Sequence, residues 1–447
     1  MKRTILLLLT AMLAVSCFER LEFGADYKPE KEEQKDPEDP DDPQPGDEPV
    51  NISYPDNGSE VKSVVFESGK DNHIYFRIPA ITETKKGTLL AFCEARNTKA
   101  DFYAGHESQF EGISVYQPGD SKDTGDIDLV LKRSTDGGAS WGKMITLFDD
   151  GNNVCGNPAP VVDWSTGRIW LFWCWQKCAS QPSNIFPSIL DGHNRRVLYS
   201  YSDDDGLTWS TPVDMTSTLK DRTWTWYATG PNHATQLISG PNKGRLIVPA
   251  NHRDAANKIN YSHCFYSDDH GKTWVLGGVT QPAGNESCIT ELSDGNILTS
   301  MRIADSNLPE GTNGKCRAFS KSTDGGASWG SFDIVESLID PGCQGAVANY
   351  HKGGEAPSST LLLSNCHHAS SRRNMTISVS KNDGKDWTSP YAVFIGRAAY
   401  SDIYVLYDGS VAVFYENGYG KYGTASPNEQ ISFHRIPPSL VASKLGL

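Results

Sequence analysis

Arginines recur in apolar, strand-like segments of the chain, where a positive charge is costly to bury. Arg77 lies inside one such segment, Arg302 ends a second, and Arg372 and Arg373 precede a third. A guanidinium buried without an anion is unfavourable, and a structural salt bridge satisfies any one of these positions taken alone. Three guanidinium groups that converge would instead bind a carboxylate, because a guanidinium and a carboxylate form charge-assisted, bidentate hydrogen bonds with each other.

The elements that must bring these arginines together are marked by a phrase that the chain repeats five times. Its pattern is Ser-x-Asp-x-Gly-x-Ser/Thr-Trp, and the copies are Ser134–Trp141, Ser202–Trp209, Ser267–Trp274, Ser322–Trp329 and the altered Ser380–Trp387. Ser and Asp side chains bond nearby backbone amides and Gly permits a positive φ, so the phrase predicts a turn between strands. We interpret the copies as clips on hairpins, in preference to calcium- or ligand-binding turns.

The spacing of the copies predicts the architecture. Their third positions lie 55 to 68 residues apart, and a period of that length is typical of a repeat fold. The flanking segments fit short strands, and the sequence has no convincing long amphipathic helix. A body of about 390 residues accommodates six units, which predicts an all-β six-bladed β-propeller of four-stranded antiparallel blades. Inner strands of a propeller surround one axis, so arginines from separate repeats can meet at its mouth.

The first 54 residues differ in composition from the rest. Residues 1–17 join a basic start to an apolar core and end in Ala14-Val15-Ser16-Cys17, which resembles a bacterial lipobox; a plain secretory signal is the alternative. Residues 18–54 are acidic and Pro-rich, with 13 acids and 4 bases between residues 18 and 48, and predict a disordered tether. We expect an exported bacterial lipoprotein, anchored in the outer membrane through lipid on Cys17, with one folded domain at residues 55–447.

Charge and cysteine count restrict the partners and the cofactors. The body carries a net charge of about −7 and no basic cluster, which argues against nucleic acid as a partner. Nine cysteines remain besides Cys17, an odd number that cannot all pair. Cys174 and Cys178, and likewise His367 and His368, lack a second ligand pair at zinc-like spacing, so no metal site is predicted.

Phe76-Arg77-Ile78-Pro79, combined with the repeated phrase (the Asp box), resembles the sialidases, or neuraminidases, of the bacterial exo-α-sialidase type. The resemblance covers essentially residues 60–440, and the combination is specific, whereas Asp boxes alone occur in other secreted propellers. It implies that residues 55–447 form a propeller catalytic domain. Such a domain would release terminal sialic acid from glycoproteins, glycolipids and oligosaccharides, with no metal or organic cofactor.

The resemblance also implies roles for the arginines noted above. Arg77 matches the first arginine of a triad that binds the sialic acid carboxylate, and Arg302 and Arg372 match the other two. Arg373 is the runner-up for the third place, because the adjacent pair leaves the register ambiguous. Glu416 matches the carboxylate that braces the first arginine.

Four further residues match the catalytic pattern. Tyr400, in Ala399-Tyr400-Ser401-Asp402, matches the nucleophile, and Glu286 matches its carboxylate partner. Asp123 takes the place of the acid/base, and Arg96 matches an extra arginine near the sugar ring. Because the anomeric carbon of sialic acid bears a carboxylate, a neutral tyrosine nucleophile avoids charge repulsion. Two displacements, with Glu286 accepting the phenol proton, imply retention of configuration.

One departure from the family pattern concerns the acid/base. The family places this residue soon after Glu-Ala-Arg, whereas residues 101–122 intervene here, so Asp101 is a rival to Asp123. Asp123 is preferred because its spacing to Ile127-Asp128 and to the next Asp box is kept. The inserted residues 102–122 are then either a loop over the site or a surface elaboration.

Three other functions compete with hydrolysis. A trans-sialidase would pass the sugar to an acceptor or to its own hydroxyl group, and the sequence does not separate the two activities. A sialoglycan-binding propeller without turnover is opposed by the complete set of Asp123, Glu286 and Tyr400. A purely structural surface propeller is opposed by the three arginines.

Overall fold

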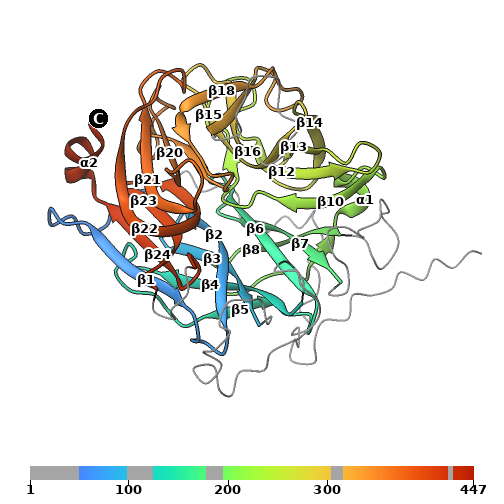
Figure 1. Cartoon of the computed structure of the whole chain (residues 1–447), viewed down its shortest axis with the longest axis horizontal. Helices are drawn as coiled ribbons and strands as arrows, with labels where there is room; N and C mark the ends of the chain where they lie inside the picture. The colour runs from blue at the N-terminus through green and yellow to red at the C-terminus, as the bar shows by residue number, and fades with distance from the viewer. Residues whose placement is uncertain (1–49, 98–122, 124, 178–194, 304–315, 421–425) are drawn as a thin grey trace, which may run out of the picture.

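The computed structural model describes residues 50–97, 123, 125–177, 195–303, 316–420 and 426–447. Within these ranges the chain forms 24 strands and two short helices, so the predicted all-β fold is confirmed. Figure 1 shows the strands gathered into sheets that are set around a common centre. The predicted signal peptide, the tether and Cys17 lie outside the described residues.

The longest sheet has eight strands. Its order is β2-β3-β4-β6-β7-β8-β9, with β5 paired to β4. Strands β4 and β6 meet through a single parallel pair, Ile127 with Val154, whereas the other pairs are antiparallel. The bounds are β2 (Tyr75–Glu83), β3 (Leu89–Arg96), β4 (Ile127–Ser134), β5 (Ile145–Phe148), β6 (Val154–Val162), β7 (Ile169–Gln176), β8 (Arg196–Ser202) and β9 (Val213–Asp214).

Two smaller antiparallel sheets follow in the chain. The first has the order β10-β12-β13-β14, with β11 paired to β12, and the second has the order β15-β16-β17-β18. Helix α1 (Thr216–Leu219) precedes them. The bounds are β10 (Trp224–Thr229), β11 (Thr235–Gln236), β12 (Leu246–Asp254), β13 (Asn260–Ser267), β14 (Val275–Val279), β15 (Gly284–Glu291), β16 (Ile297–Ile303), β17 (Cys316–Ser322) and β18 (Asp333–Ile339).

The last sheet joins the start of the described chain to its end. Its order is β1-β24-β23-β22-β21-β20-β19. Strand β22 is 18 residues long and changes partner at Arg397: before this residue it pairs with β21, and after it with β23. The bounds are β1 (Val61–Glu67), β19 (Ala346–Asn349), β20 (Leu361–Cys366), β21 (Arg373–Ser380), β22 (Thr388–Val405), β23 (Val411–Gly418) and β24 (Gln430–Ile436), followed by α2 (Pro438–Leu445).

The repeated phrase forms the predicted turn in all five copies. In the third copy Gly271 N and Asp269 N donate to Ser267 Oγ, and Thr273 Oγ1 donates to Asp269 Oδ2 at 2.6 Å. Gly271 has a φ of 84° and packs so closely on Trp170 that a Cβ atom would lie 2.2 Å from the indole. Glycine is therefore required here both for backbone conformation and for space.

The tryptophan of the phrase reaches beyond its own hairpin. Trp209 lies edge-on to Phe92 of β3, Trp274 to Phe172 of β7, and Trp387 stacks on Phe319 of β17. Each partner belongs to the preceding group of strands along the chain. The phrase therefore ties neighbouring groups together, as well as closing a hairpin.

Five of the strands share one irregularity. At one point in each of them, two successive paired residues are three positions apart in the strand but only two positions apart in its antiparallel partner. The strand therefore contains one extra residue there, which is a β-bulge. The strands are β2, β6, β10, β15 and β22, and the shifts fall after Arg77, Gly156, Trp224, Gly284 and Ala398. Glu286 and Tyr400 lie within two of these bulges, so the irregularity coincides with residues singled out from the sequence.

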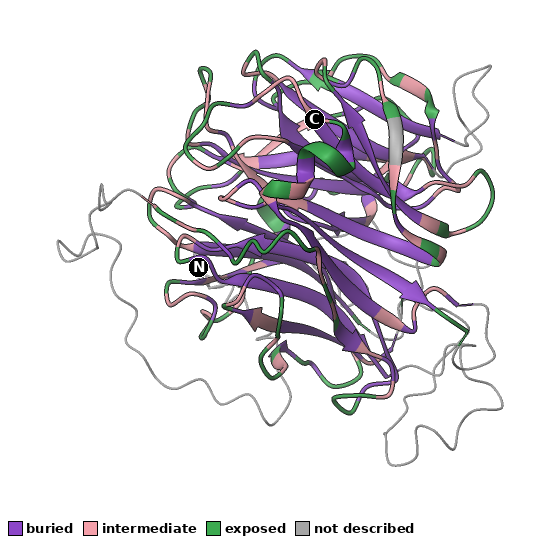
Figure 2. Ribbon diagram, turned by 90° about the vertical axis from the view of Figure 1, so that its left-hand side faces the viewer, coloured by how far each residue is buried: buried purple, intermediate pink, exposed green. Residues whose placement is uncertain are grey.

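The core lies within and between the sheets. Figure 2 shows the strands largely buried and the connecting turns largely exposed. Strands β2, β3, β6 and β7 are buried along their whole length. Polar residues that end two of these strands, Arg96 in β3 and Gln176 in β7, are therefore buried as well. Among the described residues no helix has the length and apolar character needed to cross a bilayer.

Candidate active site

The first arginine is held by a buried carboxylate. Arg77, in β2, donates from Nε to Glu416 Oε1 at 3.2 Å and from Nη2 to Glu416 Oε2 at 3.4 Å. Glu416, in β23, is fully buried and also accepts from the backbone N–H groups of Ile78 (2.8 Å) and Tyr400 (3.2 Å). Ile78 has a φ of 62°, rare for a β-branched residue. One carboxylate thus fixes the strained bulge of β2 against the strand that carries Tyr400.

The second arginine, a glutamate and a tyrosine form a compact cluster. Tyr400 Oη donates to Glu286 Oε1 at 2.7 Å and accepts from Arg302 Nη1 at 3.1 Å. Arg302 Nη1 also donates to Glu286 Oε2 at 2.7 Å. Tyr400 and Glu286 are buried, with exposures of 6 % and 9 %. Burial raises the pKa of Tyr400, and Glu286 raises it further, against the three arginines that lower it. The phenol is therefore neutral and already bonded to a base.

The third arginine completes a ring of positive charge around Tyr400. The guanidinium carbon of Arg77 lies 4.8 Å from the centre of the Tyr400 ring, and that of Arg372 lies 5.4 Å from it. Arg373, the runner-up, is exposed and pairs through its backbone with Arg397. The structure therefore places Arg372, and not Arg373, beside Arg77 and Tyr400. Within the described residues no hydrogen bond or ion pair engages the Arg372 guanidinium.

Asp123 is connected to the site through Arg96. Arg96, buried at the end of β3, pairs closely with Glu94 and donates from Nη1 to Asp123 Oδ1 at 3.3 Å. The Asp123 side chain is about half exposed. Partial desolvation by itself raises the pKa of Asp123, but the guanidinium groups of Arg96 and Arg77 outweigh it and hold the pKa below its usual value. Asp101 and the inserted residues 102–122 lie outside the described residues.

Sequence reasoning missed the residues that position Tyr400 from behind. Gln344 accepts from Ser401 N and donates to Ser401 O, both at 3.0 Å, and donates to Pro231 O at 3.1 Å. Asp402 accepts from Ile81 N (2.9 Å) and from His233, whose ring nitrogen lies 2.7 Å away. Asp402 follows Tyr400 by two residues, a spacing visible in the sequence. Gln344 and His233 lie far from Tyr400 along the chain and gave no such signal.

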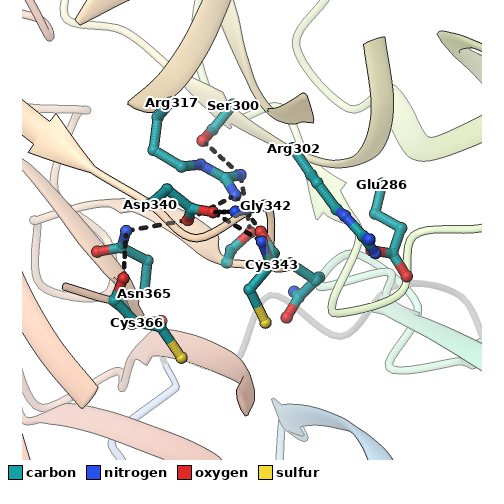
Figure 3. A network of polar contacts seen from close by, with 12 residues as sticks. Glu286, Ser300, Arg302, Arg317, Asp340, Gly342, Cys343, Asn365 and Cys366 are labelled. Carbon is teal, nitrogen blue, oxygen red and sulfur yellow. Dashed lines mark hydrogen bonds and ion pairs between the residues drawn. The ribbon is translucent and has the colours of Figure 1, made fainter. Parts of the chain in front are cut away.

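A second buried network supports the turn that presents Gln344. Asp340 accepts from the backbone N–H groups of Gly342 and Cys343 at 2.8 and 2.7 Å, and from Asn365 Nδ2 at 3.0 Å. Fully buried Arg317 donates to the carbonyl oxygen of Cys343 at 2.9 Å and to Ser300 Oγ at 3.1 Å. Figure 3 shows this network beside Arg302 and Glu286. It links the arginine-bearing strand β16 to the 340–345 turn.

The described residues include no group of three or more His, Cys, Asp and Glu side chains placed to hold a metal ion. Cys174 is buried in β7, and Cys178 lies outside the described residues. Among the described residues, the contacts given above bring together the arginines Arg77, Arg96, Arg302 and Arg372 with the carboxylates Glu94, Asp123, Glu286 and Glu416.

Comparison with known proteins places the chain in a family. The BNR repeat-like domain family matches residues 113–413. An exo-alpha-sialidase of Aspergillus fumigatus is 31% identical over 322 residues, covering 68% of this chain and 67% of the relative. The chain belongs to the sialidase family. The sialidase of Micromonospora viridifaciens is 30% identical over 368 residues, or 79% of this chain.

Solved sialidase structures share the fold. Hadza microbial sialidase Hz136 superposes with a TM-score of 0.68 at 24% identity, covering 85% of this chain and 68% of that one. A leech intramolecular trans-sialidase superposes with a TM-score of 0.66 at 18% identity, covering 86% and 70%. This sialidase-family chain spans about half the length of the Micromonospora relative and 62% of a Bacteroides fragilis sialidase.

Proposed function

We propose that the protein is a retaining exo-α-sialidase, which hydrolyses terminal sialic acid from glycoproteins, glycolipids and oligosaccharides through a covalent sialyl-tyrosine intermediate. The observation that carries the proposal is the hydrogen-bonded cluster of Tyr400, Glu286 and Arg302, ringed by Arg77 and Arg372. Membership of the sialidase family supports it. A structural propeller has no use for three arginines around one buried phenol.

Binding is assigned to the arginines. Arg77, Arg302 and Arg372 bind the carboxylate of the sugar through charge-assisted hydrogen bonds. As the glycosidic bond breaks, positive charge grows on the ring beside this carboxylate. Preorganised charges and dipoles then stabilise the transition state without reorganisation. Glu416 keeps Arg77 in place, because its two oxygens bridge Arg77 and two backbone amides.

Covalent catalysis is assigned to Tyr400. Its phenol is a weak nucleophile near neutral pH, since the pKa lies above the ordinary value of about 10. Glu286 accepts the phenol proton as the oxygen attacks the anomeric carbon, which is the activated pair required for covalent catalysis. Arg302 donates hydrogen bonds to Glu286 Oε2 and to Tyr400 Oη. It therefore stabilises the negative charge as that charge moves from the glutamate to the phenolate. Two successive displacements give net retention.

Asp123 is assigned the acid/base role. It would protonate the departing glycosidic oxygen and then remove a proton from the attacking water. Arg96 orients it and favours its ionised form, which suits the second step. Binding of an anionic substrate partly neutralises the arginines, which raises the pKa of Asp123 towards the value that the first step requires. No cofactor enters this mechanism.

We further propose that the fold is a six-bladed propeller. The units are β2–β5, β6–β9, β10 with β12–β14, β15–β18, β19–β21 with the first half of β22, and the second half of β22 with β23, β24 and β1. Two features support this division: β22 changes partner at Arg397, and β4 touches β6 through one residue pair only. The residues assigned to the site then come from several blades.

Transfer in place of hydrolysis is the second candidate. The solved structures of similar fold include intramolecular trans-sialidases from leech and from Ruminococcus gnavus. In such a reaction a hydroxyl group of the sugar itself replaces water. For the location we keep the prediction made from the sequence: a lipid-anchored protein of the bacterial outer membrane that meets sialylated glycoconjugates outside the cytoplasm.

The test is to incubate the protein with an α-sialoside and to follow the product by NMR. We expect α-sialic acid to appear first, and Tyr400→Phe to lower the turnover number by several orders of magnitude while the melting temperature is kept. A first product of β-configuration, or near-normal turnover of Tyr400→Phe, contradicts the covalent mechanism. An anhydro sugar as the product indicates intramolecular transfer, and binding without any product indicates a sialoglycan-binding propeller.

A further inference from the structure

Two of the five bulges perform the same task at the site. In β2 and β22, a backbone N–H group of the bulge donates to a buried carboxylate, which in turn holds an arginine. The amides are those of Ile78 and Tyr400, the carboxylate is Glu416, and the arginine is Arg77. Because the extra residue of a bulge is left out of the ladder, its N–H group is available to a side chain. The bulges of β6 and β10 have no role in the mechanism above.

The bulge of β6 repeats this arrangement with a different carboxylate. Asn157 N donates to Glu94 Oε1 at 2.8 Å, while Glu94 Oε2 accepts from Arg96 Nε at 2.9 Å and also from Arg96 Nη2. Glu94 is buried so closely against the bulge that a Cβ atom on Gly156 would lie 2.3 Å from its Oε1. Arg96 donates to Asp123, so one carboxylate and one arginine separate this bulge from the proposed acid/base.

Asn157 is held from its other side by a buried arginine. Asn157 has a φ of 59°, a conformation that is uncommon outside glycine but that Asn adopts more readily than most residues. Its side-chain oxygen accepts from Arg195 Nη2. Arg195 is 1 % exposed, and it also donates to Gln176 Oε1 at 2.8 Å and to the carbonyl oxygen of Tyr227. Each nitrogen of the Arg195 guanidinium is therefore used, and its partners lie on three different strands.

The bulge of β10 encloses the same arginine. Trp226 lies in this bulge, at the position that Tyr400 occupies in the bulge of β22. The guanidinium carbon of Arg195 lies 4.0 Å from the centre of the Trp226 ring, close enough for the aromatic face to attract the cation. The bulges of β6 and β10 therefore meet at Arg195, one through a hydrogen bond and the other through a ring.

We propose that Arg195 and Asn157 are positioning residues for Asp123. The connection runs from Arg195 through Asn157 to Glu94, Arg96 and Asp123, and each step is a hydrogen bond. Arg195 keeps Asn157 in the conformation that directs its N–H group at Glu94, Glu94 holds Arg96, and Arg96 orients the acid/base. This inference rests on the proposed function, because it concerns the acid/base of the same site.

The leaving group of the substrate separates positioning of the acid from general damage. A simple alkoxide needs a proton to depart, whereas the phenolate of an activated aryl sialoside does not. The ratio kcat/KM reports the first displacement, in which the acid acts. We therefore expect Arg195→Met to lower kcat/KM by about tenfold or more for methyl α-sialoside, but by less than about threefold for the aryl sialoside.

Three further variants sharpen this comparison. Arg195→Lys keeps the charge and a donor, and should restore most of the rate on methyl α-sialoside. Asn157→Gly tolerates a positive φ and keeps the N–H group that bonds Glu94, but removes the acceptor of Arg195; it should show the same selective loss to a smaller degree. Arg435→Met is the matched control, since Arg435 is equally buried and also donates to uncharged oxygens, in Gly137 and Ser410. It should not discriminate between the two substrates.

A second measurement does not depend on turnover. NMR of the ¹⁵N-labelled chain follows how fast the Arg96 Nε–H group, which donates to Glu94, exchanges with water. We expect this exchange to be about tenfold faster in Arg195→Met and unchanged in Arg435→Met, because only the first variant loosens Glu94 locally.

Two results would overturn the positioning role. One is an equal loss of kcat/KM on both substrates in Arg195→Met and in Asn157→Gly, and the other is an Arg96 exchange rate that does not respond to Arg195→Met. If Arg195→Met does not fold, Arg195→Lys and Asn157→Gly carry both measurements. If the natural chain turns over neither substrate, the proposed function fails, while the exchange rate still decides whether Arg195 holds Glu94 and Arg96 in place.

Discussion

Arg372 differs from the other arginines around Tyr400 because no carboxylate pairs with it in the described part of the chain. Arg77 is balanced by Glu416 and Arg302 by Glu286. Removing either of these arginines leaves a buried carboxylate without its partner, which destabilises the fold. A weaker affinity for substrate in such a variant could then not be separated from a loss of structure. Arg372 offers a cleaner test of carboxylate recognition.

We predict that Arg372→Ala raises KM for α-sialosides by roughly 10- to 100-fold, the range expected for loss of a charge-assisted hydrogen bond. The melting temperature should change little. Arg373→Ala is the matched control, since the neighbouring side chain is exposed, and its kinetics should equal those of the natural chain. If Arg373→Ala has the larger effect on KM, the assignment of the third arginine is reversed.

A second prediction concerns the pH dependence that Arg96 sets. Arg96 and Arg77 hold the pKa of Asp123 below its usual value, so the protonated acid becomes scarce at lower pH than it otherwise would. Arg96→Gln keeps a hydrogen-bond donor but removes the charge, which raises the pKa of Asp123. We expect the basic limb of kcat/KM for methyl α-sialoside to move to higher pH.

Two controls accompany this pH profile. An aryl sialoside, whose leaving group needs no protonation, should show a much smaller movement of the basic limb. Arg168→Gln removes an arginine that pairs with exposed Asp203 away from the site, and should leave the profile unchanged. A basic limb that stays in place, or moves to lower pH, in Arg96→Gln is incompatible with Asp123 as the acid.

At the scale of residues, the sequence predicted the charged residues of the site, but not the uncharged residues that position them. Arg77, Glu286, Arg302, Arg372, Tyr400 and Glu416 do converge, as the family resemblance implied. Gln344 and His233 could not be found in the same way, because amide and imidazole groups at these positions fit many local environments. Their role arises only from contacts between segments more than 50 residues apart.

At the scale of elements, the five repeated turns are the feature that organises the sheets. Four copies use an Asp carboxylate that accepts a hydrogen bond from a Ser or Thr hydroxyl four residues later. The fifth copy exchanges the roles: Asn382 Nδ2 donates to Asp386 Oδ2 at 2.8 Å. Both residues of the pair have changed together, so the turn is kept with the donor and the acceptor reversed.

We therefore predict that Asn382→Asp, which restores the common phrase at one position, destabilises the protein. Two carboxylates would face each other, and we expect the free energy of unfolding to fall by about 0.5–1 kcal/mol at neutral pH. The double variant Asn382→Asp with Asp386→Ser should recover this loss. Chemical denaturation measures the change, and a stabilising effect of the single variant would show that the exchange is incidental.

The sequence predicted the turns but not all that they do. The pattern of Ser, Asp and Gly determines local hydrogen bonds, so each hairpin could be located from the sequence alone. That Trp209 and Trp274 pack on the preceding group of strands depends on how the groups twist and stack, which a local pattern does not contain. For the same reason, the sequence did not predict that β22 pairs first with β21 and then with β23, because no residue type marks the position where the partner changes.

At the scale of the whole molecule, the described chain closes on itself through β1 and β24. Glu60, directly before β1, strengthens this closure. Its carboxylate contacts Lys62 at 3.0 Å, Lys444 of α2 at 3.2 Å and His434 of β24 at 3.3 Å, and it bonds Tyr391 of β22. One carboxylate thus joins the first strand to three elements from the end of the chain.

We predict that Glu60→Gln lowers the free energy of unfolding by about 1–3 kcal/mol at neutral pH. Burial by itself raises the pKa of Glu60, but Tyr391 and Lys62 outweigh it and lower the pKa to about 2 from 4.5. A depressed pKa stabilises the fold above 4.5, and this stabilisation is lost as the pH falls towards 2. The difference between the two chains should therefore disappear over this range.

Denaturation curves at several pH values measure this difference. Asp294→Asn is the control, because Asp294 pairs with Lys321 at an exposed site and both side chains are more than 40 % exposed. It should change the free energy of unfolding by less than about 1 kcal/mol. If Glu60→Gln lowers the free energy of unfolding by the same amount at pH 2, packing of the side chain, and not its charge, stabilises the pairing of β1 with β24.

The extra residue that carries Tyr400 in β22 separates activity from architecture. Side chains alternate between the two faces of a strand, so deleting one neighbour such as Ala399 would turn the phenol away from Glu286 while regular pairing with β23 became possible. A single codon lost in frame at this point would therefore disturb the Tyr400–Glu286 hydrogen bond more directly than the pairing of β22 with β23.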